Sequence, residues 1–292
     1  MEEGEVVLAV RAFDALLRER GVPYHAERPL APYTTMKVGG PAEFLVEPRT
    51  PEDLAAVFSA ARECDLPVRF LGSGANLLVG DAGTRGAVIY LRHFGRRDGL
   101  HVGAGYSLPR LCKETAAEGL TGLEVLAGIP ATVGGAVRMN AGGKHGEIAS
   151  SVLYVDVMTP AGDLRRMSKE QVGFRYRRTS LDGAIVIAAG FDLRPGEGAR
   201  ARYDAVMDEK RKAQPLGTHN AGCMFKNPPG GHAGRMIDQC GLKGERVGGA
   251  HVSRKHANFI VNDGGATASD VLALVERIRS RIPALELEVE VW

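Results

Sequence analysis

The stretch Leu71-Gly72-Ser73-Gly74-Ala75-Asn76-Leu77-Leu78 decides how the chain is interpreted, because its glycines stand between two short apolar segments. Residues 68–71 and 77–79 are expected to be strands. The backbone N–H groups of such a turn can form a concave nest that binds an anion. The stretch lacks the third glycine of a dinucleotide-binding fingerprint, and a strand follows it where that fingerprint requires a helix. Taken alone, it fits an ordinary tight hairpin turn better than a ligand site.

A second glycine-rich stretch lies downstream, at Gly128-Ile129-Pro130-Ala131-Thr132-Val133-Gly134-Gly135, and continues into Met139-Asn140-Ala141-Gly142-Gly143. Two nearly neutral loops suit a dinucleotide pyrophosphate that is bound by backbone amides rather than by Lys or Arg. A glycine-rich barrel corner would explain one loop more easily than both. The chain holds 38 glycines among 292 residues, and no repeat accounts for them, which favours loops whose backbone approaches a ligand.

Composition excludes several classes of protein. The 37 Lys and Arg nearly balance the 35 Asp and Glu, for a net charge of +2, which argues against nucleic acid or an anionic membrane as partner. No apolar run approaches the roughly 18 residues of a membrane span, and the N-terminus is acidic where a signal peptide is basic, so a cytoplasmic location is expected. The four cysteines form no Cys-x-x-Cys pair, so no metal site is expected.

The apolar pattern predicts an α+β protein. Helices are expected over residues 6–20, 52–65, 107–118, 200–212 and 269–280, with Pro51 at the first turn of the second. Strands are expected over residues 43–47, 68–71, 77–79, 87–91, 101–103, 151–158, 184–191 and 285–292. The Pro- and Gly-containing stretch 194–198 is expected to be a linker, with a domain boundary near residue 196.

The ordered motifs also carry a resemblance to a known family. The two glycine loops, with Gly103-Ala104-Gly105 between them, resemble the FAD-binding domain of the vanillyl-alcohol-oxidase type. Further motifs make the chain most similar to the UDP-N-acetylenolpyruvoylglucosamine reductases, from about Thr34 to Val291. They are Thr34-Thr35-Met36-Lys37-Val38-Gly39-Gly40, Phe174-Arg175-Tyr176-Arg177, Gly222-Cys223-Met224-Phe225-Lys226-Asn227-Pro228, Lys255-His256-Ala257-Asn258-Phe259 and Leu285-Glu286-Leu287-Glu288-Val289.

The resemblance implies a domain organisation and two cofactors, FAD and NADPH. Residues 1–195 would form a vanillyl-alcohol-oxidase-type FAD-binding domain of two α+β subdomains, about 1–64 and 65–195. Residues 196–292 would form a smaller α+β substrate-binding domain. By similarity, the FAD-binding residues would be Val38, Gly39, Gly72, Ser73, Gly74, Ala75, Asn76, Leu77, Gly128, Ile129, Thr132, Gly134, Gly135, Asn140, Ala141 and Gly142.

The resemblance also implies a reaction, the NADPH-dependent reduction of UDP-N-acetylglucosamine enolpyruvate to UDP-N-acetylmuramate in peptidoglycan precursor synthesis. Arg177 would hold the substrate carboxylate, and Glu288 would help to stabilise or protonate the enol. Cys223 stands where the family has a proton-donating serine. A thiol is a stronger acid than a hydroxyl and can fill that role. Softer matches to substrate-binding positions are Tyr176, Lys210, Gln214 and Asn227, with Lys226 beside them.

Each catalytic candidate has a plain alternative. Arg175, Arg177 and Arg178 form a charge run, which is usually a solvated face. Cys223 taken alone fits a buried structural thiol, and in the segment 285–292 spacing does not decide which glutamate turns inward. Only 46 residues separate Arg177 from Cys223 (223 − 177), which is short for the subgroup with an extra lid and resembles the lidless subgroup.

Two other functions stay open at this point. One is an oxidase of the same flavin superfamily that acts on an unrelated alcohol, and the other is a nucleotide-binding sensor that has kept the fold without turnover. The expected partners are small molecules, with the chain as a monomer or a weak oligomer. Flavin reduction by NADPH and reoxidation by the enolpyruvyl nucleotide would separate these functions.

Overall fold

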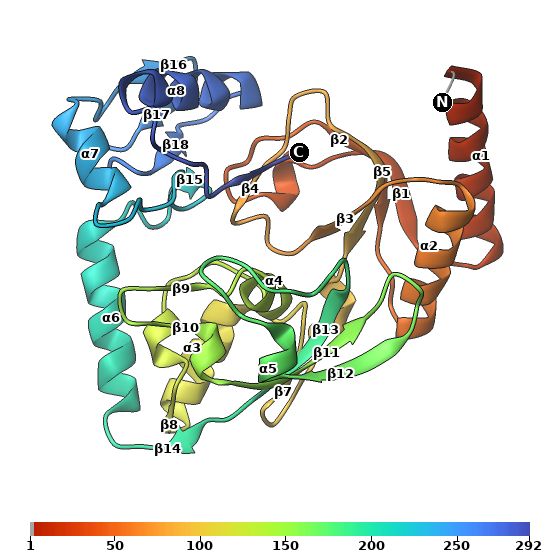
Figure 1. Cartoon of the computed structure of the whole chain (residues 1–292), viewed down its shortest axis with the longest axis horizontal. Coiled ribbons are helices and arrows are strands. Elements are labelled where there is room, and N and C mark those ends of the chain that lie inside the picture. Colours follow the sequence, from red (N-terminus) through yellow and green to blue (C-terminus); the bar gives the residue numbers. More distant parts are fainter. Residues whose placement is uncertain (1–2) are drawn as a thin grey trace. The chain divides into compact units, whose positions relative to one another are not determined.

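The computed structural model describes residues 3–292 and shows helices and strands mixed along the chain (Figure 1). This confirms the predicted α+β class. The helices are α1 (Glu3–Glu19), α2 (Pro51–Glu63), α3 (Leu108–Ala117), α4 (Val133–Arg138), α5 (Lys169–Val172), α6 (Ala199–Ala213), α7 (Ala233–Gln239) and α8 (Ala268–Arg281). No helix among residues 3–292 is long and apolar enough to cross a membrane.

The chain divides into two compact units, each built from three segments. Unit 1 comprises residues 1–27, 43–72 and 85–207, and unit 2 comprises residues 28–42, 73–84 and 208–292. The division falls inside α6, between Met207 and Asp208, rather than in the stretch 194–198. Within that stretch Arg194–Pro195 forms the short strand β14, which pairs with β8 (Leu120–Thr121). The assignment of an FAD role and a substrate role to two domains stays a prediction.

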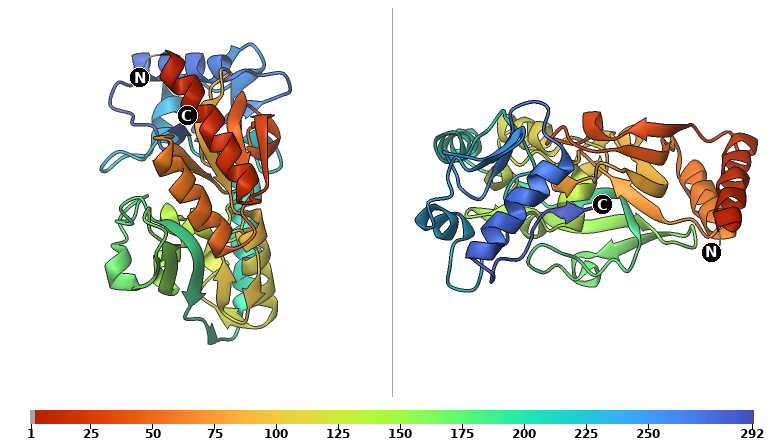
Figure 2. Two further views of the ribbon diagram at one scale, coloured as in Figure 1. Left: turned by 90° about the vertical axis from the view of Figure 1, so that its right-hand side faces the viewer. Right: turned by 90° about the horizontal axis from the view of Figure 1, so that it is seen from above.

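Unit 1 is organised around two sheets. The first has the order β1 (Tyr24–Pro29), β2 (Pro41–Val46), β5 (Thr84–Tyr90) and β3 (Val68–Leu71), with β3 and β5 parallel. Helices α1 and α2 lie side by side in both sets of views (Figures 1 and 2). The second sheet is antiparallel, in the order β12 (Leu164–Ser168), β11 (Val152–Met158), β13 (Ile185–Phe191), β7 (His101–Gly103) and β6 (Arg97–Asp98).

The second sheet carries the short helix that follows the second glycine loop. Helix α4 packs on β13, and a small antiparallel ladder, β9 (Gly142–Gly143) with β10 (Gly146–Glu147), follows it. Short 3-10 turns connect these elements: η2 (Arg92–Phe94), η3 (Glu124–Leu126) and η4 (Ile148–Ser150).

Unit 2 has a four-stranded antiparallel sheet covered by one helix. Its order is β15 (His219–Asn220), β18 (Ile260–Asn262), β17 (Ala250–Val252) and β16 (Arg246–Val247), and α8 packs on β16 and β17 (Figure 1). Strand β4 (Leu77–Leu78) pairs in parallel with β19 (Glu290–Val291). The unit's core includes Met36, Val38 and Leu78 from the two earlier segments, packed with residues of the last 85 positions. The turn η1 (Ala31–Tyr33) lies in the first segment of this unit.

One predicted strand is mostly wrong. Residues 285–292 were expected to form one alternating strand, but only Glu290–Val291 is a strand, and Leu287 adds an isolated bridge to Phe225. The segment contacts two different partners in succession, first the chain around Phe225 and then β4. A continuous ladder along one partner is therefore absent from the described segment, although its sequence alternates as a strand does.

Candidate functional site

Residues 73–76 of the first glycine loop lie in unit 2, and three of their backbone amides have no partner among the described residues. Among residues 3–292, the N–H groups of Gly74, Ala75 and Asn76 donate no hydrogen bond to another residue. Gly74 has φ +60°, and a Cβ there would lie 2.5 Å from the Tyr33 carbonyl oxygen, so only glycine fits. Unpartnered amides in a turn are donors for an anion such as a diphosphate. The loop therefore fits the pyrophosphate of a dinucleotide such as FAD.

The segment 34–40 is fastened to this loop. The Thr35 amide donates to the Gly74 carbonyl (3.2 Å), and the Thr35 hydroxyl donates to the Asn220 carbonyl (2.7 Å). The Thr34 hydroxyl donates to the Val38 carbonyl (2.9 Å), and Val38 is buried. Unit 2 thus brings Val38 and Gly39 close to residues 73–77. That these residues bind FAD stays a prediction. Thr35 was quoted in the sequence motif without a role, and nothing in its local pattern signals this one.

The second glycine loop lies in unit 1 and uses its amides differently. The first three amides of α4 are bonded within the protein: Val133 N–H to the Tyr106 carbonyl (2.9 Å), Gly134 N–H to the Ala104 carbonyl (2.8 Å) and Gly135 N–H to the Thr132 hydroxyl (3.3 Å). These amides are not open donors. The loop does meet the end of β3, because a Cβ on Gly72 would lie 2.7 Å from the Thr132 hydroxyl oxygen.

Asn140 fixes the chain beyond α4. It is buried, with its backbone at φ +42°. Its side-chain amide donates to the Glu147 carboxylate (2.7 Å) and to the Arg175 carbonyl (3.1 Å), while its oxygen accepts from the Ala149 N–H (3.3 Å). The Asn140 side chain therefore serves the fold of unit 1 and holds the turn that carries Arg177.

Arg177 stands at the tip of a tight turn. Arg175 and Arg178 exchange two backbone hydrogen bonds (2.9 and 3.2 Å), which leaves Tyr176 and Arg177 at the tip. Arg177 has φ +57°, a conformation costly for a residue with a Cβ. Its guanidinium donates to the Gly142 carbonyl (3.0 Å) and lies 4.9 Å from the centre of the Tyr176 ring. Arg175 and Arg178 are exposed whereas Arg177 is half-buried, so the run is not a uniformly solvated face.

Cys223 and Glu288 are brought together in unit 2 through the residue that follows Cys223. The Glu288 N–H donates to the Met224 carbonyl (2.9 Å), and the Asn76 side-chain amide donates to the Glu288 carbonyl (3.0 Å). Glu286 and Glu290 are exposed, whereas Glu288 is half-buried. Cys223 is also half-buried, while Cys64 and Cys112 are buried and Cys240 is exposed. Of the three glutamates in the tail, Glu288 thus lies beside both the first glycine loop and the Cys223 segment.

The predicted substrate-binding residues are spread over both units. Tyr176 lies in unit 1 and is 52% exposed. In unit 2, the Asn227 side-chain oxygen accepts from the Ala233 N–H at the start of α7 (3.0 Å), and Lys226 pairs with Glu286 (3.3 Å). Lys210 lies in the last turn of α6, and its carbonyl accepts from the Gln214 N–H (2.8 Å).

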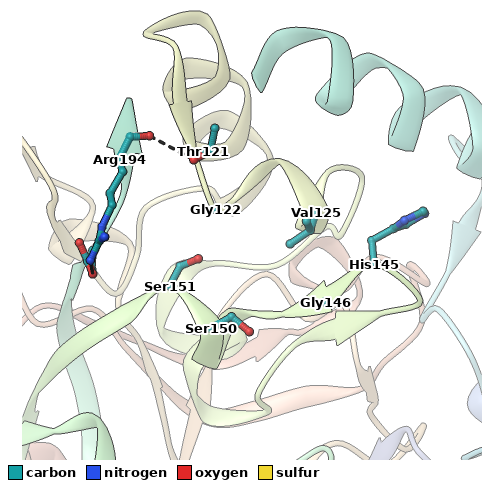
Figure 3. A pocket seen from close by; sticks show the side chains of 9 residues that line it. Thr121, Gly122, Val125, His145, Gly146, Ser150, Ser151 and Arg194 are labelled. Atoms are coloured by element: carbon teal, nitrogen blue, oxygen red, sulfur yellow. Dashed lines mark hydrogen bonds and ion pairs between the residues drawn. The ribbon is translucent and has the colours of Figure 1, made fainter. Parts of the chain in front are cut away.

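A separate cavity of about 390 Å³ lies within unit 1 (Figure 3). It is lined by Thr121, Gly122, Val125, His145, Gly146, Ser150, Ser151, Asp192 and Arg194, and Thr121 donates to the Arg194 carbonyl across its rim (3.1 Å). Arg194 pairs with Asp192 (3.4 Å), so the two charges of the lining are compensated. None of the predicted site residues lines it. Residues 3–292 contain no cluster of His, Cys, Asp or Glu suited to a metal ion.

Two family models match the chain. Residues 42–168 match the FAD-binding domain, and residues 214–292 match the C-terminal domain of UDP-N-acetylenolpyruvoylglucosamine reductase. The first model spans the second glycine loop and the region around β3 and β5, and the second spans the segment with Cys223 and Glu288.

Several proteins named as UDP-N-acetylenolpyruvoylglucosamine reductases are similar to this chain over nearly their whole length. The chain is 45% identical to UDP-N-acetylenolpyruvoylglucosamine reductase 2 of Symbiobacterium thermophilum over 95% of this chain and 94% of that protein. It is also 45% identical to the UDP-N-acetylenolpyruvoylglucosamine reductase of Moorella thermoacetica, over 90% and 91%. The crystal structure of the reductase from Thermus caldophilus superposes with a TM-score of 0.84 at 46% identity and covers 93% of this chain and 98% of that one.

Proposed function

The chain belongs to the family of UDP-N-acetylenolpyruvoylglucosamine reductases, which are FAD-dependent oxidoreductases, and we propose that it reduces UDP-N-acetylglucosamine enolpyruvate to UDP-N-acetylmuramate with NADPH. The observation that carries the proposal is the meeting, within unit 2, of an amide-rich loop with Cys223 and Glu288. A loop with open amides, bonded to the backbone that carries a cysteine and a glutamate, suits a cofactor diphosphate and a proton transfer at once.

The backbone amides of Gly74, Ala75 and Asn76 would hold the FAD pyrophosphate. When bound, FAD supplies a group that accepts a hydride from NADPH and delivers one from N5 to C3 of the enolpyruvyl ether. The chain's own residues then have to bind the substrate carboxylate, stabilise the charge that develops and protonate C2.

We assign those tasks as the motifs suggest. Arg177 would bind and polarise the carboxylate through its planar guanidinium. Once C3 has gained the hydride, the electron pair at C2 takes the proton of the Cys223 thiol, which yields the lactyl ether and a thiolate. Solvent then reprotonates the thiolate. Glu288 would stabilise the enol or help to deliver the proton.

Tyr176, Lys210, Gln214, Lys226 and Asn227 would contact the nucleotide sugar. Lys226 is free to exchange its exposed partner Glu286 for a phosphate, because an exposed ion pair contributes little. We also propose that the enzyme acts in the cytoplasm, on small molecules alone.

The test is a pair of half-reactions followed anaerobically by the visible absorbance of the holoenzyme. NADPH should bleach the bound FAD, and UDP-N-acetylglucosamine enolpyruvate should restore the oxidised spectrum, whereas oxygen should restore it only slowly. Rapid reoxidation by oxygen with no response to the enolpyruvyl nucleotide would instead indicate an oxidase acting on another substrate. A protein that binds ligands without any bleaching by NADPH would be a sensor.

The role of Cys223 has its own test. Cys223→Ser should keep reoxidation by the enolpyruvyl nucleotide, because a hydroxyl can also donate the proton, and Cys223→Ala should slow it by about 10²-fold or more. Bleaching by NADPH should be unaffected in both variants. If Cys223→Ala is reoxidised at the rate of the unchanged protein, Cys223 is not the proton donor.

A further inference from the structure

We propose that Asn258 is a positioning residue that sets the backbone on which Cys223 and Glu288 depend; the inference rests on the proposed function of these two residues. Asn258 is 2% exposed and belongs to none of the predicted catalytic or binding sets. It lies in the turn between β17 and β18 of unit 2.

Asn258 forms hydrogen bonds with the backbone of Met224 and Phe225, the two residues directly after Cys223. Its side-chain oxygen accepts from the Phe225 N–H (2.9 Å), and its side-chain amide donates to the Phe225 carbonyl (2.8 Å). Its own backbone carbonyl accepts from the Met224 N–H (2.7 Å). A side chain thus does for the segment 224–225 what the backbone of a neighbouring strand does in a sheet.

The other side of the same segment is bonded to the tail that carries Glu288. The Met224 carbonyl accepts from the Glu288 N–H (2.9 Å), and the Lys226 N–H donates to the Glu286 carbonyl (2.9 Å). Met224 and Phe225 are each only 1% exposed. The segment after Cys223 is therefore fixed on one side by Asn258 and on the other by the tail, and Cys223 and Glu288 both attach through Met224.

Asn258 is itself held in place. Its N–H donates to Nδ1 of His256 (3.3 Å), and the Ser253 hydroxyl accepts from the Lys255 and His256 N–H groups (3.1 and 3.3 Å). A Cβ on Gly234 of α7 would lie 3.5 Å from the Asn258 Cβ. These contacts hold the backbone and Cβ of Asn258 in place. A residue that positions another segment needs such support of its own.

The consequence for catalysis is specific. A residue bearing a proton donor must be placed to within a fraction of an ångström, and a small misplacement lowers the rate of the step it serves. Loss of the Asn258 amide would leave the buried Phe225 N–H and carbonyl without partners and free Met224 to shift. The shift would affect protonation of the substrate and leave the reaction of NADPH with the cofactor unchanged.

The experiment compares Asn258→Leu with Val275→Ala, a truncation in the hydrophobic core of unit 2 that controls for a general loss of stability in that unit. All variants carry Cys240→Ser, so that the exposed thiol of Cys240 does not react in the alkylation experiment described next. Cys64 and Cys112 are buried. Asn258→Leu should slow reoxidation by the enolpyruvyl nucleotide on the order of 10- to 100-fold. Bleaching by NADPH should stay within about threefold of the parent, and Val275→Ala should change neither.

A second readout does not depend on turnover. The alkylation of Cys223 by iodoacetamide, followed by mass spectrometry across pH, reports the exposure and acidity of the thiol itself. In Asn258→Leu this alkylation should be faster by about threefold or more, with a displaced pH profile. Val275→Ala should keep the parent profile.

Asn258→Asp covers the case in which Asn258→Leu does not fold. The introduced carboxylate can accept from the Phe225 N–H but cannot donate to the Phe225 carbonyl until it is protonated. Its reoxidation rate relative to the parent should therefore rise as the pH falls.

The proposal is overturned if the Asn258 variants match Val275→Ala in both readouts, or if both half-reactions decline together. A parent enzyme that does not respond to the enolpyruvyl nucleotide would instead refute the proposed function, and the alkylation profiles would still test the role of Asn258.

Discussion

Arg177 stores backbone strain at the position where the proposed chemistry needs a guanidinium. Its φ of +57° places it in the left-handed region, in a turn closed by Arg175 and Arg178. An L-residue costs roughly 1–2 kcal/mol there, whereas glycine does not. Strain of this kind persists where the surrounding structure imposes it, here through Asn140 and the Gly142 carbonyl.

We expect the free energy of unfolding of Arg177→Gly to exceed that of Arg177→Ala by about 1 kcal/mol, with a higher urea midpoint. Both variants lose the guanidinium, but only the glycine relieves the backbone strain. Both variants should lose reoxidation by the enolpyruvyl nucleotide. Urea denaturation and the two half-reactions measure this. Equal stability of the two variants would mean that the turn relaxes when the side chain is removed.

His256 makes the stability of unit 2 depend on pH. Burial lowers the pKa of its imidazole, which outweighs a backbone hydrogen bond that raises it, and Lys243 lowers it further. Since the folded pKa lies below the unfolded value near 6.5, the unfolded chain takes up the proton first. The stabilisation is therefore complete above about pH 6.5 and falls as the pH drops below that value.

The prediction is a urea midpoint that declines from pH 7.5 to pH 5 in the unchanged protein and declines less in His256→Gln. The two proteins differ only at this residue, so the difference between the two curves isolates His256. Parallel curves would show that its burial does not couple to folding.

The glycines show where a sequence-based interpretation reaches its limit. Their excess was attributed to loops near a ligand, and the open amides of the Gly74 loop agree with that. Other glycines serve close approaches of the chain to itself: a Cβ on Gly103 would lie 1.9 Å from the Phe94 carbonyl oxygen. Residue type alone does not distinguish an approach to a ligand from an approach to a neighbouring strand.

At the scale of elements, helix α8 is capped twice at its N-terminus. Thr267 and Asp270 form a capping box, and Asp81 reaches in from the loop after β4 to accept from the Ala268 N–H (2.7 Å), the Ser269 N–H (3.0 Å) and the Ser269 hydroxyl (2.7 Å). Burial raises the pKa of the Asp81 carboxyl, but these hydrogen bonds outweigh it and the pKa is lowered. The carboxylate is thus a folding contact between two segments far apart in sequence.

Asp81→Ala should destabilise the protein by about 1 kcal/mol at neutral pH, as loss of a helix cap does, and Asp81→Asn should cost less because it keeps one acceptor. The folded pKa is depressed, so this contribution is present above the unfolded value near 3.9 and is lost as the pH falls through the folded value. The difference in thermal midpoint between parent and Asp81→Ala should accordingly shrink in acid. A difference that is constant with pH would exclude the charge as its source.

Elements with strong local signals were predictable from the sequence. Thr50 and Asp53 form a capping box at the start of α2 with Pro51 in its first turn, and the predicted helix 52–65 matches it closely. Helix α4 was not predicted, because its residues Val133–Arg138 include two glycines that disfavour a helix in isolation. It is supported by tertiary hydrogen bonds that the Val133 and Gly134 N–H groups donate to the carbonyls of Tyr106 and Ala104.

The candidate site was predictable only as a set of residue types. The motifs named Cys223, Glu288 and Arg177, but the side-chain bonds that hold them come from Asn258, Asn76 and Asn140. Each of these contacts joins residues more than 30 positions apart. Asparagine has no periodicity or spacing that would indicate such a partner from one sequence.

At the scale of the whole molecule, the chain enters unit 2 three times. The segment 28–42 contributes Met36 and Val38 to its core, and the segment 73–84 contributes Leu78, the pairing of β4 with β19 and the Asp81 cap. The Asn262 side chain also donates to the Met36 carbonyl (3.0 Å). A domain cut at residue 196, as the sequence suggested, would leave all of these contacts out.

We therefore expect the fragment 196–292 not to fold on its own. Burial of Met36, Val38 and Leu78 contributes roughly 1.5–3 kcal/mol each, and the sum is comparable to the 5–15 kcal/mol that stabilises a typical domain. Circular dichroism during urea denaturation should show a gradual change for the fragment and a cooperative transition for the whole chain. Adding the peptides 28–42 and 73–84 should shift the fragment toward the folded state. A cooperative transition of the fragment alone would show instead that the last third of the chain is an independent domain, and that it folds without the two earlier segments.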